Sequence, residues 1–253
     1  MELYHKTYGA GEVVVILHGL FGMSDNWKTI ARQISDTYSV VLVDLPNHGK
    51  SPRLPIFDLH AVVESLYSFL TDNWMYDIRL VGHSLGGKVA MLFAQQYPDM
   101  VDRLVSIDIA PKVYKPGHQT IFKALNSLDL KALSSRKEAS NLLSKLISDE
   151  GTRLFLLKNL KRSGEGFDWK FDLKTLYRDY ENILIPVNTS ESYDGPTLFV
   201  RGGRSHYIDE KNDESFIKKV FPAAEFVTIE NAGHWVHADQ PEKLEQSLRT
   251  FFE

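Results

Sequence analysis

The fold of this chain is decided by the stretch Ile78-Arg79-Leu80-Val81-Gly82-His83-Ser84-Leu85-Gly86-Gly87-Lys88-Val89-Ala90. A short apolar run precedes a Gly-x-Ser-x-Gly turn, and a helix-compatible segment follows it. This order predicts a strand, a sharp turn and a helix, in which Gly82 and Gly86 let the strand and the helix approach closely. The turn presents Ser84 at a helix N-terminus, where free N–H groups and the helix dipole favour negative charge. Ser84 is therefore a candidate nucleophile, with an ordinary turn residue as the alternative.

Further apolar runs repeat the pattern of a strand that is buried on both faces of a parallel sheet. Between them lie segments with helical periodicity, including one that follows a possible cap at Asp58 and one that follows Pro241. Strands that alternate with helices predict an α/β fold with a doubly wound, mostly parallel sheet. The expected strands are residues 13–17, 38–43, 78–81, 104–107, 197–200 and 225–229.

Residues 112–195 interrupt this alternation, because they contain helix-like pieces and no convincing buried strand. A block of this length is too long for an ordinary crossover between strands. We expect a helical cap, or lid, inserted above the carboxyl ends of the strands, where α/β proteins place their sites. The core would then comprise residues 1–111 and 196–253. The expected cap helices are residues 119–128, 136–147, 152–160 and 174–180.

Composition excludes several classes of function. The net charge is −4 with basic and acidic residues interspersed, so no basic patch indicates a nucleic-acid partner. The longest early apolar run, residues 13–17, is too short to span a bilayer, and no secretory signal is expected. The chain has no cysteine, which removes disulfides, thiolate metal sites and a cysteine nucleophile. We expect a cytoplasmic protein that does not insert into membranes, and the sequence does not give its oligomeric state.

The loop His18-Gly19-Leu20-Phe21-Gly22 directly follows the first buried strand. In a hydrolase arrangement such a loop supplies one backbone N–H to an oxyanion hole, and the residue after the nucleophile supplies the other. We expect Leu85 to be one donor and Leu20 the other, with Phe21 as the alternative. An ordinary glycine-bearing turn is the competing interpretation.

A serine hydroxyl needs an adjacent imidazole to take its proton. On this scaffold the histidine comes late in the chain, and His234 lies in the loop between the last strand and the last helix. His237 is the second candidate for the base. The other histidines are expected to anchor loops (His18, His48), to lie at the surface or at caps (His5, His60, His118) or to line the pocket (His83, His206).

The carboxylate that orients the histidine usually follows the penultimate strand, but that position holds Ser205 here. Asp108 lies at the end of the strand after the nucleophile's own strand, and it could reach the imidazole from there. Asp108 is therefore our candidate acid, with capping of the strand end as its alternative role. Asp209, Glu210 and Asp194 remain alternatives. No His-Glu-x-x-His motif or dinucleotide-binding glycine pattern is present, so we expect no metal and no cofactor.

Taken together, the motifs around Leu20, Asp44, Ser84, Asp108 and His234 resemble the α/β-hydrolase superfamily over essentially the whole chain. The combination is similar to the bacterial YbfF-type esterases and the related eukaryotic ABHD-eleven-like hydrolases. This resemblance implies an acid at the position of Asp108, which agrees with the serine at position 205. It also implies cleavage of short acyl esters, with thioesters of coenzyme A among the possible ligands.

The sequence thus predicts a serine carboxylesterase that cleaves small to medium acyl esters of small molecules through an acyl-enzyme intermediate. An acyl-CoA thioesterase, a carbon–carbon bond hydrolase and a lyase remain alternatives on the same scaffold. A binding protein without catalysis is a further alternative, because fold alone does not guarantee activity. The expected substrate-binding residues are Phe21, His83, Tyr114 and Trp235.

Overall fold

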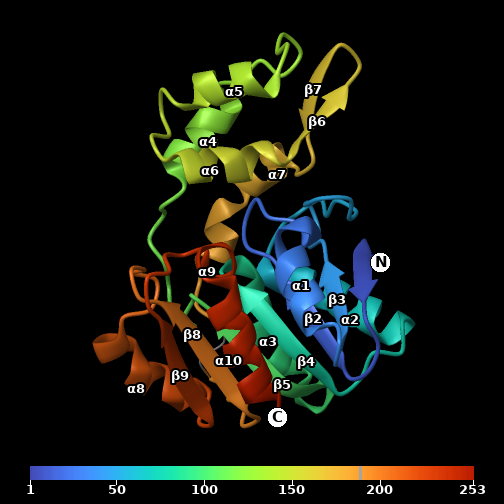
Figure 1. Ribbon diagram of the computed structural model, residues 1–253, viewed down its shortest axis with the longest axis vertical. Coiled ribbons are helices and arrows are strands. Elements are labelled where there is room, and N and C mark those ends of the chain that lie inside the picture. Colours follow the sequence, from blue (N-terminus) through green and yellow to red (C-terminus); the bar gives the residue numbers. More distant parts are fainter. Residues whose placement is uncertain (188–189) are drawn as a thin grey trace.

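The computed structural model describes residues 1–187 and 190–253, with only the backbone at Glu210. Strands and helices alternate along most of the chain (Figure 1). The strands are β1 (His5–Tyr8), β2 (Val13–Leu17), β3 (Ser39–Val43), β4 (Ile78–His83), β5 (Val101–Ile107), β6 (Leu160–Ser163), β7 (Gly166–Trp169), β8 (Thr197–Gly202) and β9 (Ala224–Ile229). The α-helices are α1 (Lys28–Ile34), α2 (Leu59–Asp72), α3 (Leu85–Gln96), α4 (Gln119–Asn126), α5 (Arg136–Leu143), α6 (Glu150–Leu157), α7 (Leu173–Arg178), α8 (Glu210–Val220), α9 (Val236–Asp239) and α10 (Pro241–Phe252). Short 3-10 helices are η1 (Ser24–Trp27), η2 (Pro98–Met100) and η3 (Tyr180–Ile183).

Seven strands form one sheet in the order β1-β3-β2-β4-β5-β8-β9. Every pair is parallel except β1 with β3, which is antiparallel. The prediction of a doubly wound, mostly parallel sheet is confirmed. The sequence analysis missed β1, whose residues are only partly buried because it forms the edge of the sheet. The parallel arrangement brings the carboxyl ends of β2, β4, β5 and β8 to one edge.

Helices cover both faces of the sheet, and each face has its own apolar core. Ile30 of α1 and Leu248 of α10 are fully buried against one face. Val63 of α2 and Ile217 of α8 are buried on the opposite face, together with α3. Asp58 caps α2 by accepting the Ala61 N–H at 2.8 Å, as its sequence predicts. No helix in the described ranges combines the length and the apolar character that a membrane span requires.

The elements α4 to α7 lie together above the sheet (Figure 1). The sequence predicted helices alone for this segment, and that prediction was wrong in one respect. Strands β6 and β7 form an antiparallel hairpin, with Leu160 paired with Trp169 and Ser163 with Gly166. Gly164, with a φ of 59°, makes the tight connection. Leu160 and its partner Trp169 are buried on one side of the hairpin, whereas Lys161 on the other side is exposed, so the hairpin packs with one side.

Candidate active site

Ser84 occupies a strained turn between β4 and α3, with φ of 53° and ψ of −116°. A Cβ atom at Gly82 would lie 2.2 Å from the carbonyl oxygen of Gly86. A Cβ atom at Gly86 would lie 2.5 Å from the carbonyl oxygen of Leu17 on the neighbouring strand. Both glycines are therefore required for strand and helix to meet so closely, as the sequence predicted. The turn is held by the packing of β2 and β4, which fixes the hydroxyl at the sheet edge.

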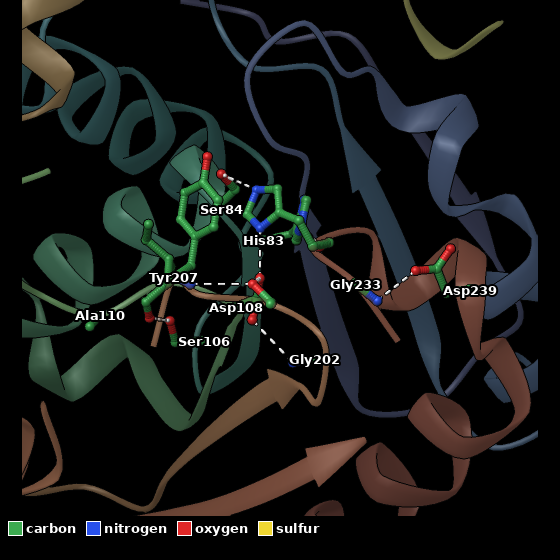
Figure 2. Close-up of polar contacts among 12 residues, drawn as sticks. His83, Ser84, Ser106, Asp108, Ala110, Gly202, Tyr207, Gly233 and Asp239 are labelled. Carbon is green, nitrogen blue, oxygen red and sulfur yellow. Dashed lines mark hydrogen bonds and ion pairs between the residues drawn. The ribbon is translucent and has the colours of Figure 1, made fainter. Parts of the chain in front are cut away.

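The structure brings His234 to the hydroxyl of Ser84. His234 lies in the loop between β9 and α9, and its Nε2 atom is 3.0 Å from Ser84 Oγ. Its Nδ1 atom is 2.7 Å from Oδ2 of Asp108. Figure 2 labels Ser84 and Asp108, and a dashed line runs from each of them to the imidazole ring between them. Three loops that are far apart in sequence thus form one chain of hydrogen bonds.

Asp108 follows β5 with a φ of 52°, and its side chain is completely buried. Besides the imidazole, its carboxylate accepts the Gly202 N–H at 3.1 Å (Figure 2) and the Ser205 hydroxyl at 2.5 Å. Donors from the β8 end therefore bind a carboxylate that comes from the β5 end. Ser205, which occupies the position where an acid was expected, donates to Asp108 instead. Hydrogen bonds of this kind stabilise the charged form of a buried carboxylate.

The alternative acids lie elsewhere. Asp209 caps α8 and accepts the backbone N–H groups of Lys211 and Asn212. Asp194 is exposed and accepts the hydroxyl of Ser192. The side chain of Glu210 lies outside the described part of the chain. Of the candidates whose side chains are described, Asp108 is therefore the one hydrogen-bonded to His234.

The loop of residues 18–22, the candidate oxyanion loop, is held by two buried histidines. His18 accepts the Leu45 N–H at Nε2 and donates from Nδ1 to the Gly19 carbonyl, so it anchors the loop as expected. His48 accepts the Phe21 N–H at Nε2, 3.2 Å away. Burial lowers the pKa of His18, and it lowers the pKa of His48 to about 3, so both rings stay neutral and can accept. The Phe21 N–H is thereby engaged, which favours Leu20 as the oxyanion donor of this loop.

The remaining histidines take different positions. His237, the second candidate base, is buried and stacks on Trp27 with ring centroids 4.3 Å apart. His83 is buried and donates from Nε2 to the backbone carbonyl of His234 at 2.8 Å. Burial holds the pKa of His83 well below its usual value. His83 thus supports the loop that carries His234.

His118 corrects a prediction. It stands at the N-terminal boundary of α4, as expected for a cap, but its side chain makes no capping hydrogen bond. Its ring lies in the cavity wall instead, with Nδ1 2.6 Å from the hydroxyl of Tyr180. Burial lowers the pKa of His118 to about 4, so the ring is neutral at pH 7. No sequence pattern indicates this position, because it depends on how residues 112–195 pack.

Two cavities meet at Ser84. The larger has a volume of about 280 Å³ and the smaller about 60 Å³, and Leu20, Ser84 and His118 border both. Of the predicted substrate-binding residues, Tyr114 lines the larger cavity, and Phe21, His83 and Trp235 line the smaller. The sequence analysis did not single out Tyr207 or Lys88, which also line the larger cavity. Lys88 had a signal, because it follows Ser84 by four residues and so lies on the same helix face.

Residues 12–241 match the family model described as alpha/beta hydrolase fold. The chain belongs to the α/β-hydrolase family. This α/β hydrolase is 37% identical to the sn-1-specific diacylglycerol lipase ABHD11 of Mus musculus, over 94% of this chain and 80% of that protein. It is 34% identical to Esterase YbfF of Escherichia coli (strain K12), over 94% of this chain and 92% of that protein.

A solved structure named Marine microorganism esterase is also similar to this α/β hydrolase. It has a TM-score of 0.95 and 37% identity, with 99% of each chain covered. These relatives carry the names of esterases and lipases. The predicted family and the predicted class, a hydrolase of esterase type, are therefore confirmed.

Proposed function

We propose that this α/β hydrolase is a serine carboxylesterase in which Ser84, His234 and Asp108 act as the catalytic triad. The observation that carries the proposal is the continuous hydrogen-bonded path from Ser84 Oγ through the imidazole to the buried carboxylate, with distances of 3.0 and 2.7 Å. His234 takes the proton of Ser84 as the hydroxyl attacks the ester carbonyl, and returns it to the leaving alcohol. Asp108 fixes the ring orientation and stabilises the imidazolium. Water then hydrolyses the acyl-enzyme.

The backbone N–H groups of Leu20 and Leu85 would bind the oxyanion. Leu85 is the first residue of α3, so its N–H is one of the groups left free at the helix N-terminus. Leu20 borders both cavities beside Ser84. Each donor of an oxyanion hole contributes about 3 kcal/mol to the stability of the transition state.

The two cavities suggest where the parts of the ester bind. The leaving alcohol must receive its proton from His234 Nε2, and His234 lines the smaller cavity. We therefore assign the alcohol to the smaller cavity, between Phe21 and Trp235, and the acyl chain to the larger cavity beside Tyr114. A volume of about 280 Å³ suits small to medium acyl chains.

We further propose that residues 112–195 act as a cap over this site. Tyr114, His118 and Tyr180 from this segment line the larger cavity, and Phe155 lines the smaller. Phe155 packs against Trp235 with ring centroids 5.1 Å apart, so the cap contacts the loop that carries His234. We retain the cytoplasm as the expected compartment, since a chain without cysteine depends on no disulfide.

Hydrolysis of p-nitrophenyl butyrate and labelling by a fluorophosphonate test the proposal. Ser84→Ala should lower kcat by roughly three orders of magnitude or more and abolish labelling. Ser65→Ala is the matched control, because Ser65 is a buried serine on α2 that donates to the Ala61 carbonyl. Labelling that persists in Ser84→Ala would move the nucleophile elsewhere. A wild-type protein that neither hydrolyses esters or acyl thioesters nor takes the label would be a binding protein.

A further inference from the structure

Lys88 is a buried lysine in the wall of the larger cavity. It is the fourth residue of α3 and is only 2% exposed. Its Nζ donates to the carbonyls of Ile183 at 3.0 Å and Ile185 at 2.5 Å, and it lies 5.1 Å from the ring centre of Tyr114. An ammonium has three hydrogens, so one N–H of Lys88 is not bound by these two carbonyls.

The charge of Lys88 has no counterion among the residues that the structure describes. Among the ion pairs of the described residues, none includes Lys88. Burial lowers the pKa of its ammonium to about 7, and no carboxylate in the described part of the chain counteracts this effect. The ammonium also lies near the N-terminus of α3, where the helix dipole is positive. A buried cation in such surroundings is costly unless an anion joins it.

The charged side chains that line the larger cavity are lysines. Besides Lys88, the lining includes Lys115, together with His118, which is neutral at pH 7, and His206. Within the described part of the chain, no aspartate or glutamate lines this cavity. The whole protein has a net charge of −4, so the basic lining is opposite in sign to the rest of the molecule. Such a local excess attracts anions into a site with low-dielectric walls.

The place of Lys88 in α3 brings its side chain close to the site where the ester carbonyl would react with Ser84. Residues four apart lie on the same helix face, and long side chains lean toward the N-terminal turn. The Lys88 side chain therefore stands one turn beyond Ser84, and its backbone N–H donates to the Ser84 carbonyl at 3.1 Å. A group held by Lys88 would be separated from the ester carbonyl by only a short chain.

We propose that the acyl part of the substrate carries an anionic group, a second carboxylate, that binds Lys88 in the larger cavity. The substrates would be monoesters of short dicarboxylic acids. Hydrolysis of each uses one water and releases the alcohol, the dicarboxylate and one proton. This inference rests on the proposed esterase function and on the assignment of the acyl chain to the larger cavity.

The experiment compares monoethyl esters of succinate, glutarate and adipate with the neutral ethyl esters of butyrate, pentanoate and hexanoate. Hydrolysis is followed by pH-stat titration at pH 6.5. The wild type should prefer the best monoester over its neutral counterpart by at least about tenfold in kcat/KM, chiefly through KM. Lys88→Met should lower this preference by about tenfold, and Lys88→Arg should keep it. Lys115→Met changes the other lysine of the lining and should alter the preference less.

The alternative is that Lys88 only ties α3 to residues 183–185. In that case Lys88→Met would affect charged and neutral esters alike, and an unchanged preference would overturn the proposal. A wild type that prefers neutral esters would overturn it too, while Ser84-dependent hydrolysis of those esters would leave the esterase function standing. If Lys88→Met fails to fold, inhibition of the wild type by glutarate and by butyrate tests the proposal instead. Glutarate must then inhibit at least about tenfold more tightly than butyrate, and equal inhibition rejects the proposal.

Discussion

The phenol ring of Tyr207 lies flat on the imidazole of His234, with ring centroids 3.8 Å apart and an interplanar angle of 15°. The edges of that imidazole bind Ser84 and Asp108. Tyr207 is itself fixed, because its carbonyl accepts the hydroxyl of Tyr114 at 2.7 Å. The stack therefore holds the plane of the ring while the hydrogen bonds hold its rotation. We infer that Tyr207 is a positioning residue for the base.

Removal of this stack should slow the reaction without unfolding the protein. We expect Tyr207→Ala to lower kcat for p-nitrophenyl butyrate by about tenfold, because a misplaced base loses part of its proton-transfer advantage. Tyr207→Phe keeps the stacked ring and should retain kcat within a factor of about two. Steady-state kinetics together with urea unfolding separate the two effects. A kcat of Tyr207→Ala equal to that of the wild type would assign the stack a packing role only.

The hydrogen bond between Ser205 and Asp108 predicts that a carboxylate moved from position 108 to position 205 can still orient His234. Asp108→Asn should lower kcat by about 10⁴-fold, since an amide cannot hold the imidazole in the required tautomer. The Ser205 hydroxyl lies 2.5 Å from Asp108 Oδ2, so a carboxylate at position 205 would reach the same side of the ring. We expect Asp108→Ser combined with Ser205→Asp to recover at least about tenfold over Asp108→Asn.

Two controls accompany this rescue. Ser205→Ala removes one donor from the buried carboxylate and should lower kcat by only about threefold to tenfold, because Gly202 and His234 still bind it. Asp209→Asn changes a helix cap and should leave kcat as in the wild type. An equal loss in Asp209→Asn and Asp108→Asn would transfer the role of the acid to Asp209.

The parts of the fold that the sequence predicted correctly depend on local constraints. The turn at Ser84 needs glycine at positions 82 and 86, and the central strands need continuous β-branched runs on both faces. Such requirements leave a pattern in neighbouring residues. The contact between Asp108 and His234 could not be predicted in the same way. It depends on which strands are neighbours in the sheet, here β5 and β8, and no local pattern indicates that. That is why Asp209, Glu210 and Asp194 remained alternatives to Asp108 in the sequence analysis.

The parts that the sequence missed depend on packing between distant segments. The β6–β7 hairpin has strands of four residues, too short for a clear period, although its two-residue connection at Gly164 was a usable signal. His118 enters the cavity wall only because the cap brings it to Tyr180. Lys88 is buried only because residues 183–185 cover its ammonium. These positions depend on how residues 112–195 pack on the core, and no pattern in neighbouring residues indicates that.

Buried histidines should make this protein sensitive to acid, and His237 offers the test. Burial lowers the pKa of His237 from 6.5 to about 3, so below pH 6.5 the unfolded chain binds a proton that the folded chain refuses. The free energy of unfolding therefore falls as the pH drops from 6.5 toward 3, by about 1.4 kcal/mol per unit for one such group. Nδ1 of His237 has no hydrogen-bond partner among the described residues, so His237→Phe keeps the stack on Trp27 and leaves no new polar atom unpaired. Urea unfolding should show that the free energy of unfolding of this variant falls by about 1.4 kcal/mol less than that of the wild type between pH 7.5 and 5.5. Between pH 8.5 and 7.5 the two proteins should not differ. If the free energy of unfolding falls equally in both proteins as the pH is lowered, His237 accepts a proton in the folded state.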